Sequence, residues 1–381
     1  MKRIQKCIIW VCSLLFLLPF ALFAQRKVNI PTDKILVEVE SNGKWGFIDP
    51  TGKWIIEPGF EGAKKFVDGV ALVKYLGEWH YMNGEAEMIS EGKPYTVRYN
   101  FSEGLGRVEE NALWGYINQT GEWAIQPVYD DARDFSEGYA AVKTGTYWGY
   151  IDKYGNRIIE PSFLIAKDFH DGVALVKTTK GFRYLSITNT FLPVPDDIEL
   201  KHDFSDGMAP VVKSKLWGFV NTEGEVIIPP QYSKMRKFTE GLAPVRQNKT
   251  WGYIDKTGNW VIEPRFQDAK NFSDGIGLVK KAGQWCYINT NGELLGEGEL
   301  YIIHHPFHEG LARTELRGNW GFIDINGNWI IQPEFERARD FSNGYAAVRQ
   351  NGRWGFTDRN GNMVIPPHFD NAKDFIRIIY R

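Results

Sequence analysis

The chain has very little cysteine, with three in 381 residues. Cys7 and Cys12 lie in an apolar N-terminal segment that we expect to be removed, so only Cys286 remains in the mature chain. A single thiol cannot form an internal disulfide. We therefore expect the mature protein to be stabilised by packing alone.

The chain also lacks a dominant charge. It carries 45 Lys and Arg residues against 47 Asp and Glu residues, a formal net charge of −2. Removing residues 1–24, which hold three basic residues and no acidic one, leaves a net charge of −5. Proteins that bind nucleic acid usually show a strong basic balance or patch, so we expect no nucleic-acid partner.

Long apolar runs are scarce, and the one that stands out covers residues 8–24. Lys2, Arg3 and Lys6 precede it and Ala24 ends it, which predicts a signal peptide over residues 1–24, followed by a short N-terminal segment of residues 25–34. An uncleaved membrane anchor is the alternative, at the short limit for a span. No cysteine follows for lipid attachment. We expect a periplasmic, outer-surface or secreted protein with no membrane span in the mature chain.

Aromatic residues and glycine, by contrast, are plentiful, with 14% aromatic residues, 14 Trp and 39 Gly. A Trp-Gly pair recurs at intervals of 34 or 69 residues, and each interval of 69 contains a weaker copy at Trp79, Phe182 or Trp285. Residues 35–381 therefore hold ten units of about 34 residues. The strong pairs begin at Trp45, Trp114, Trp148, Trp217, Trp251, Trp320 and Trp354.

The units also follow a longer period of 103 residues. Residues 68–74 and 171–177 share the sequence DGVALVK, and Trp45 is 103 residues from Trp148. We infer that a block of three units was copied three times and is followed by one further unit. The degenerate units lie near residues 69–103, 172–206 and 275–309.

Residues 241–274 illustrate one unit. Residues 241–246 (GLAPVR) and 251–255 (WGYID) predict two strands joined by a tight turn. Asp255 opens and Gly258 closes a second turn, because Asp caps backbone amides and Gly adopts positive φ angles. A third strand over residues 260–263 ends at a Pro, and a connector follows. Such a three-stranded antiparallel meander is not stable alone.

We expect an all-β protein in which ten meander units stack into an open, twisted, solenoid-like body. The alternative is a closed β-propeller-like ring. Propellers usually have about four to eight blades of four strands, which ten units of three strands fit poorly. Residues 375–381 resemble the start of another first strand, and they either cap the last unit or pair with the first unit to close a ring.

The units resemble the bacterial WG repeat, also called the KWG repeat. The resemblance rests on Trp-Gly-Tyr/Phe-Ile-Asp, the closing Gly, Ile-x-Pro and Phe-Ser-Glu/Asp-Gly-Leu/Tyr-Ala, and it covers about residues 35–375. It implies a β-rich and often exported protein. It supplies no catalytic residues, and the weak copies depart from its pattern.

Two sets of side chains suggest metal binding, and each has a structural alternative. The turn of residues 324–327 (DING) comes nearest to a calcium loop, but further oxygen ligands are not in register, so we favour turn capping. His304, His305 and His308 are close enough in sequence for a transition-metal site. Because the other weak copies lack this cluster, we favour a surface connector.

Two further sets suggest catalysis. Glu57, Glu160 and Glu263 precede the repeat Pro and would suit glycoside hydrolysis if two of them lay about 5–10 Å apart. Acids recur there in several units, however, whereas a catalytic pair is normally unique. Cys286 is either a reactive thiol or, as we favour, a small apolar side chain. With no nucleophile elbow, phosphate loop or zinc-binding helix motif, we assign no catalytic, cofactor-binding or metal residues and expect no enzyme activity and no cofactor.

Rows of aromatic rings remain as candidates for binding. We expect the repeat Trp rings to form the core between units. The second Trp of a unit is replaced by other residues elsewhere, which favours partial exposure and a binding face. It occurs as Trp54, Trp123, Trp260 and Trp329.

These observations predict a non-enzymatic repeat scaffold outside the cytoplasm, which binds a protein or a cell-envelope polysaccharide and is a monomer. The alternative is a carbohydrate-binding module that uses the aromatic rows, and a hydrolase is the least favoured. We expect specificity to lie in the weak copies. The sequence names no individual binding residue.

Overall fold

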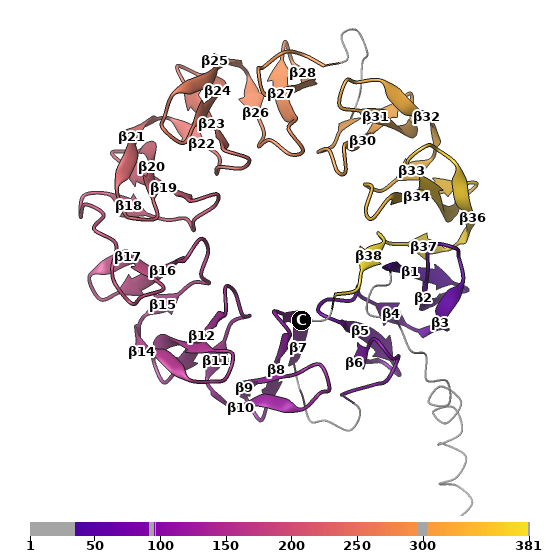
Figure 1. The fold of residues 1–381 in the computed structure, drawn as a ribbon, viewed down its shortest axis with the longest axis horizontal. Helices are drawn as coiled ribbons and strands as arrows, with labels where there is room; N and C mark the ends of the chain where they lie inside the picture. Colours follow the sequence, from indigo (N-terminus) through magenta and orange to yellow (C-terminus); the bar gives the residue numbers. More distant parts are fainter. Residues whose placement is uncertain (1–34, 91–94, 96, 296–302, 380–381) are drawn as a thin grey trace, which may run out of the picture.

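The structure, a computed structural model, describes residues 35–90, 95, 97–295 and 303–379. These residues form ten antiparallel sheets arranged as the blades of a closed ring (Figure 1). The predicted all-β class is confirmed. The expected open, solenoid-like array is wrong, and the alternative of a closed propeller is the observed fold.

We number the blades 1 to 10 along the ring. Within the described residues, seven of them have at least four strands, and blade 1 holds a fifth, β38 (Ile376–Arg377), that also pairs with β1. These are, from the inner to the outer strand, β37 (Asn371–Ala372), β1 (Ile35–Ser41), β2 (Lys44–Ile48) and β3 (Trp54–Phe60) in blade 1; β7 (Val97–Ser102), β8 (Leu105–Glu110), β9 (Leu113–Ile117) and β10 (Trp123–Tyr129) in blade 3; β11 (Asp131–Ala132), β12 (Tyr139–Thr144), β13 (Tyr147–Asp152) and β14 (Arg157–Phe163) in blade 4; β18 (Glu199–Leu200), β19 (Met208–Lys213), β20 (Leu216–Asn221) and β21 (Val226–Tyr232) in blade 6; β22 (Lys234–Met235), β23 (Leu242–Gln247), β24 (Thr250–Asp255) and β25 (Trp260–Phe266) in blade 7; β29 (Ile303–His304), β30 (Leu311–Leu316), β31 (Asn319–Asp324) and β32 (Trp329–Phe335) in blade 9; and β33 (Arg337–Ala338), β34 (Tyr345–Gln350), β35 (Arg353–Asp358) and β36 (Met363–Phe369) in blade 10.

The other three blades have three strands and coincide with the weak copies of the repeat. They are β4 (Gly62–Ala63), β5 (Val70–Tyr75) and β6 (Glu78–Asn83) in blade 2; β15 (Ile165–Ala166), β16 (Val173–Thr178) and β17 (Gly181–Ser186) in blade 5; and β26 (Asp268–Ala269), β27 (Gly277–Lys281) and β28 (Gln284–Ile288) in blade 8. In each of these three blades a single bridge stands where the other seven have their outer strand, between Met82 and Met88, Leu185 and Phe191, and Ile288 and Leu294.

The innermost strand of most blades is only two residues long, which is too short for the sequence pattern to predict. In blade 4 the pairing is Asp131 with Lys143 and Ala132 with Val142. This short strand belongs to the segment that the sequence analysis treats as a connector. It turns a three-stranded unit into a four-stranded blade, which removes the main objection to a propeller.

The ring closes because the C-terminal segment pairs with the first long strand of the chain. Ala372 of β37 lies opposite Val39 of β1, and β38 (Ile376–Arg377) pairs with the start of the same strand. Both alternatives for the C-terminal residues are thereby resolved in favour of ring closure. An open array would leave the edge of β1 unpaired, which sheets generally avoid.

The hydrophobic core lies between the blades. Tyr150 and Phe163 of blade 4 pack with Phe169 and Val176 of blade 5, and the rings of Tyr150 and Phe169 are 4.8 Å apart. The same arrangement repeats around the ring and includes the junction of blades 10 and 1. Side chains of adjacent copies therefore interlock, so that each blade buries its apolar faces against its two neighbours.

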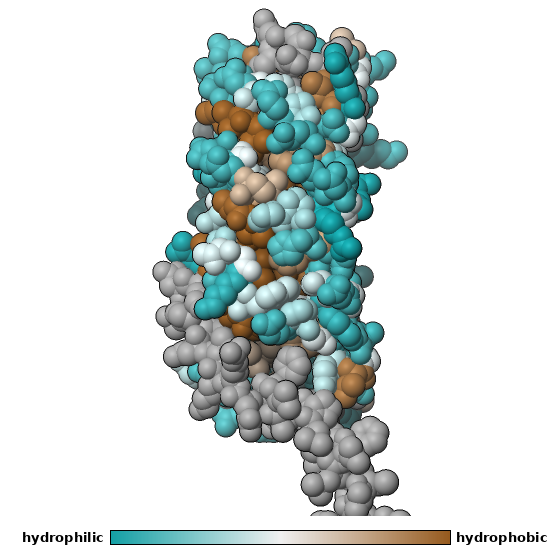
Figure 2. Space-filling view, turned by 90° about the vertical axis from the view of Figure 1, so that its right-hand side faces the viewer, coloured by the Kyte–Doolittle hydropathy of each residue, from teal (hydrophilic) through white to brown (hydrophobic). Residues whose placement is uncertain are grey.

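The outer strands form the rim of the ring. They contribute exposed β-branched side chains, among them Ile158, Ile227, Val261 and Ile330. Figure 2 shows the rim from the side, with apolar side chains between more hydrophilic margins.

Candidate functional site

In blades 2 to 10 a tight turn joins the first two strands and projects toward the middle of the ring (Figure 1). In blade 4 it contains Glu137 and Gly138, with φ angles of 54° and 85°. Two successive positive φ angles are typical of a type I′ hairpin turn, which explains why an acidic residue or Asn is followed by Gly in the units of blades 2 to 10.

These turns are linked to one another by the acidic side chains. The carboxylate of each turn accepts a hydrogen bond from the Gly amide of the next turn, at 2.7–3.1 Å, in eight successive pairs of the described chain. The pairs are Asp68–Gly104, Glu103–Gly138, Glu137–Gly172, Asp171–Gly207, Asp206–Gly241, Glu240–Gly275, Asp274–Gly310 and Glu309–Gly344. Charge-assisted bonds of this kind are stronger than neutral ones.

A second set of bonds runs parallel to the first. The hydroxyl before the acidic residue donates to the carbonyl of a Phe in the next blade, as Ser136 does to Phe169 at 2.7 Å. The same bond is made by Ser102, Ser205, Thr239, Ser273 and Ser342. Histidine takes the place of this hydroxyl at His170 and at His308, and each of the two lines a cavity.

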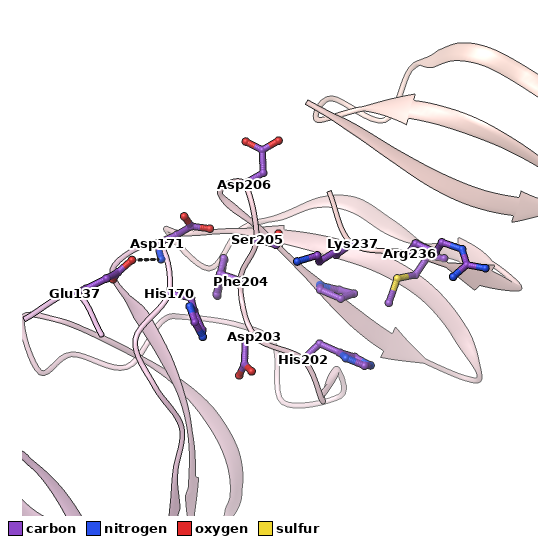
Figure 3. A pocket seen from close by; sticks show the side chains of 12 residues that line it. Glu137, His170, Asp171, His202, Asp203, Phe204, Ser205, Asp206, Arg236 and Lys237 are labelled. Atoms are coloured by element: carbon purple, nitrogen blue, oxygen red, sulfur yellow. Dashed lines mark hydrogen bonds between the residues drawn. The ribbon is translucent and has the colours of Figure 1, made fainter. Parts of the chain in front are cut away.

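The cavity beside His170, here named the His170 cavity, is the larger of the two, at about 660 Å³. Figure 3 shows the side chains that line it, from the inner turns of blades 4 to 7. His170, His202 and Asp203 point to one side of the backbone of residues 202–206, and Asp206 points to the other. The lining residues are Glu137, His170, Asp171, His202, Asp203, Phe204, Ser205, Asp206, Pro210, Met235, Arg236 and Lys237.

Comparison with the other copies of the repeat explains why space is left here. Arg107 and Arg313 stand 103 residues before and after Pro210. Each arginine ion-pairs with an aspartate of the next blade, Arg107 with Asp134 at 3.0 Å and Arg313 with Asp340 at 2.8 Å. Pro210 provides no such group, so this interface lacks the arginine that occupies it in the other two copies.

The charge at the position of the aspartate partner is also reversed. Lys237 occupies the position that Asp134 and Asp340 hold in the other copies. The cavity is thus lined by Arg236 and Lys237 as well as by Asp203. The Oδ1 atom of Asp203 is buried and has no hydrogen-bond partner. Buried polar atoms without a partner are rare, and they favour a ligand that would supply one.

One carboxylate of this cavity is held in the charged form. Burial alone would raise the pKa of Asp206, but hydrogen bonds from Lys256 at 2.6 Å and from the Gly241 amide at 2.7 Å bring that pKa below its ordinary value. The carboxylate of Asp206 therefore links two of the inner turns, and its hydrogen bonds are already made within the protein. Asp203 is the carboxylate that remains open to a ligand.

Seven tryptophans of the repeat, and Phe182 at the equivalent position, lie beneath cations. Trp251 is buried, and the other repeat Trp rings are half-buried. A Lys or Arg lies over the ring at 5.1–5.7 Å from its centroid, which is a cation–π distance. The pairs are Trp45–Lys373, Trp79–Lys64, Trp114–Arg107, Phe182–Lys177, Trp251–Arg236, Trp285–Lys270, Trp320–Arg313 and Trp354–Arg339.

The second Trp of a unit is half-buried and packs edge-on against another aromatic ring. Trp54 contacts Phe369, Trp123 contacts Tyr95 and Trp260 contacts Tyr232, with centroids 5.3–5.8 Å apart. These rings contribute to the interfaces between repeats. Their half-burial agrees with the predicted partial exposure, whereas no observation tests the predicted binding face.

The metal-binding hypotheses receive no geometric support. Asp324 accepts hydrogen bonds from the amides of Asn326 and Asn328 at 2.9 and 2.8 Å, as a turn cap does. The ring of His305 stacks on Trp320, and the side chain of His304 lies outside those described. Within the described residues, no group of three or more His, Cys, Asp or Glu side chains is arranged to hold a metal ion.

The catalytic candidates are not brought together either. Glu57, Glu160 and Glu263 are exposed on the outer strands of blades 1, 4 and 7, so they do not form one site. Cys286 is half-buried, and burial raises the pKa of its thiol. A higher pKa leaves less of the reactive thiolate at neutral pH.

Fold and site together define a ten-bladed β-propeller whose blades are copies of one repeat. The sequence pattern of one family, described as "WG containing repeat", matches more than half of the chain. It matches residues 45–79, 114–145, 148–180, 217–251, 251–285, 320–354 and 354–377. The chain belongs to this family, and a bacterial origin and export stay predictions.

Solved structures offer distant similarities only. A eukaryotic initiation factor aligns with a TM-score of 0.49 and 10% identity over 92% of this chain and 99% of the other. The dihydro-heme d1 dehydrogenase NirN aligns with a TM-score of 0.35 and 11% identity over 91% and 75%, and Hsv2p of Kluyveromyces lactis with 0.32 and 10% over 64% and 98%. These values are too low to carry an argument. The chain matches no curated protein.

The structure adds one fact on membranes. In the described part of the chain, no helix is long and apolar enough to cross a bilayer. The predicted signal peptide and the segment that follows it lie outside the described residues.

Proposed function

We propose that this protein is a non-enzymatic scaffold that binds a protein partner outside the cytoplasm, with the His170 cavity as the main contact. The observation that carries this proposal is the replacement of a recurring interface arginine by Pro210, which leaves a cavity lined by charges of both signs. A position that repeats in every unit serves the fold. A departure from the repeat that opens a polar cavity is a candidate for binding.

Two further cavities, of about 400 and 320 Å³, are lined by residues within 197–217 and 180–200, and neither shares a lining residue with the His170 cavity. Exposed Phe182 and Phe191 lie in the same weak copy. Aromatic and arginine side chains dominate the binding energy of many protein interfaces, so this stretch suits a protein partner. It also agrees with the expectation that weak copies carry specificity.

The test is to fill the cavity with the arginine–aspartate pair of the copy 103 residues further on. The double variant Pro210→Arg/Lys237→Asp reproduces Arg313 and Asp340. Wild-type residues 25–381 and this variant are used to capture proteins from the native cell envelope. We expect a partner that the wild-type chain retains and the variant loses, with both chains equally stable.

A matched control separates the cavity from the repeat as a whole. His202 stacks on Trp217 with centroids 5.5 Å apart, and His305 stacks on Trp320 at the same distance. His202→Ala should weaken capture, whereas His305→Ala should not. Equal capture by the wild-type chain, the filled variant and both alanine variants would contradict the proposed site.

A carbohydrate-binding function is the second candidate. It rests on half-buried Trp54, Trp123 and Trp260, whose ring edges are taken by neighbouring aromatics. A glycan array probed with the folded chain tests it. Saturable glycan binding that survives filling of the His170 cavity would favour it over the protein partner.

A further inference from the structure

Glu38 is a buried acid at a position where no other copy of the repeat has one. It precedes the repeat Trp of blade 1 by seven residues, on β1. The same position holds Leu72, Arg107, Ala141, Leu175, Pro210, Pro244, Leu278, Arg313 and Ala347 in the other units. The copies in its own phase of the 103-residue period carry only Ala or Pro. Glu38 is therefore not required by the fold.

The side chain of Glu38 is almost fully buried, with 5% of its surface exposed. Its Oε2 atom has no hydrogen-bond partner, and the residue lines a cavity of about 330 Å³ at the junction where the ring closes. We name this cavity the seam cavity. Leaving a buried carboxylate oxygen without a donor is costly, so the site is incomplete as it stands.

A second carboxylate in the seam cavity is in the same condition. Asp374 follows β37, and its Oδ1 atom is buried without a partner. Burial raises the pKa of Asp374, and Arg339 only partly offsets this effect. Two carboxylate oxygens in one small cavity therefore each lack a donor.

The cations nearby are directed elsewhere. Lys373 places its ammonium group 5.6 Å from the centroid of the Trp45 ring. Lys65 is exposed, and although both lysines line the cavity, neither hydrogen-bonds to the Oε2 atom of Glu38 or to the Oδ1 atom of Asp374. The third carboxylate of the cavity, Asp340, differs from the other two because its Oδ1 atom forms an ion pair with Arg313 at 2.8 Å, and His308 lies 3.8 Å from its other oxygen.

Internal comparison shows what the cavity lacks. Counting 27 residues on from Arg107 and from Arg313 leads to their ion-pair partners, Asp134 and Asp340. The same count from Glu38 leads to Lys65. The charges are exchanged at this interface, but Lys65 is an exposed residue at the edge of the cavity lining and does not donate to Glu38 Oε2. The interface therefore has a buried carboxylate oxygen without a donor.

We propose that the seam cavity binds a primary ammonium group, whose N–H groups donate hydrogen bonds to Oε2 of Glu38 and Oδ1 of Asp374. An ammonium carries three donors and a compact charge, which suits two carboxylate oxygens in one small cavity. The group belongs either to a free amine or to the side chain of a lysine in a bound polypeptide. This proposal is independent of the His170 cavity and of any partner bound there.

The experiment uses the mature chain and three probes. Cadaverine represents a free amine, and N-acetyl-lysine methylamide represents a lysine side chain in a polypeptide. N-acetyl-norleucine methylamide has a similar apolar stem but no ammonium. Isothermal titration at pH 8 should show one saturable site for at least one amine and none for the neutral analogue. The stronger of the two amines identifies the source.

Two variants and a proton count complete the test. Glu38→Gln should reduce amine affinity at least tenfold, whereas Glu40→Gln, two residues along β1 and outside the cavity lining, should leave it unchanged. At pH 7, where a carboxyl with a pKa of about 7 is half protonated, binding should release about half a proton, measured on the wild-type chain by titration in buffers of different ionisation enthalpy. No saturable amine binding, equal binding by Glu38→Gln, or binding without proton release would each overturn the proposal.

Discussion

The carboxylate of Glu137 accepts two hydrogen bonds from the next blade, from the Asp171 amide at 2.7 Å and from the Gly172 amide at 2.8 Å. A single acidic side chain thus fixes the turn that follows it by 34 residues. The same relationship recurs along the ring. It gives the acidic residue of the repeat a structural role between blades.

Replacing Glu137 by Gln tests the value of this contact. Glutamine keeps one acceptor oxygen but loses the charge and the second acceptor, so one of the two amides loses its partner. Because the side chain is exposed, we expect a loss of about 1 kcal/mol in the free energy of unfolding. Chemical denaturation measures it. Glu122→Gln, in an exposed turn on another face of the repeat, is the control, and an equal loss there would contradict the assignment.

Replacing the glycine after a repeat Trp should cost more stability than replacing Glu137. A Cβ atom added to Gly149 would lie 2.4 Å from the carbonyl oxygen of Ile159, on the next strand of the same blade. Gly149→Ala should therefore destabilise the protein by about 3 kcal/mol or more, because backbone must move. At Gly145, where the added atom meets nothing within 4 Å, alanine should cost only the strain of a positive φ, about 1 kcal/mol. Similar losses for the two variants would contradict this explanation.

The sequence alone predicts a large part of this fold. Spaced Trp-Gly pairs located the units, and the Asp255 to Gly258 turn was predicted as it is observed, with Asp255 capping the amides of Thr257 and Asn259 at 2.9 Å. These features depend on residues a few positions apart. Their chemistry can therefore be deduced from a single unit.

Closure of the ring could not be deduced in the same way. The pairing of Val39 with Ala372 joins residues more than 300 positions apart, and two-residue strands such as β26 (Asp268–Ala269) have no periodicity to detect. Missing that strand made the units look unlike propeller blades. The replacement of an arginine by Pro210 was visible in the sequence, but its meaning required knowing that Arg313 pairs with Asp340 across an interface.

Glu38 predicts an unusual dependence of stability on pH. Burial raises its pKa from 4.5 to about 7, with Lys373 and Lys65 lowering it only in part and Asp374 raising it. Below pH 4.5 this carboxyl is neutral in both the folded and the unfolded chain. Between pH 4.5 and 7 the unfolded chain loses the proton and the folded chain retains it, so stability falls as the pH rises.

The size of this effect follows from the same values. Above pH 7 the loss is complete and amounts to about 3 kcal/mol. The difference in unfolding free energy between Glu38→Gln and the wild-type chain should therefore be larger at pH 8 than at pH 4.5 by about this amount. Denaturant titrations at the two pH values measure it. A difference that does not change with pH would show that the surroundings of Glu38 do not disfavour its ionised form.

Removing the C-terminal strands should open the ring. A chain that ends at residue 370 lacks β37 and β38, and with them Phe375, which is buried between blades 10 and 1. β1 then has an unpaired edge, and exposed edge strands promote association with other chains. We expect a larger radius of gyration in X-ray scattering and self-association in size-exclusion chromatography. A chain that ends at residue 379 keeps both strands and is the control.

Phe375→Ala separates the loss of packing from the loss of strand pairing. It keeps β37 and β38 but leaves a space where the ring of Phe375 contacts the rings of Phe356 and Tyr345, at 4.7 and 5.1 Å. Truncations of this kind cost about 3–5 kcal/mol. The variant should therefore unfold at lower denaturant while keeping the radius of the closed ring. If the chain ending at residue 370 also keeps that radius, the C-terminal strands do not hold the ring closed.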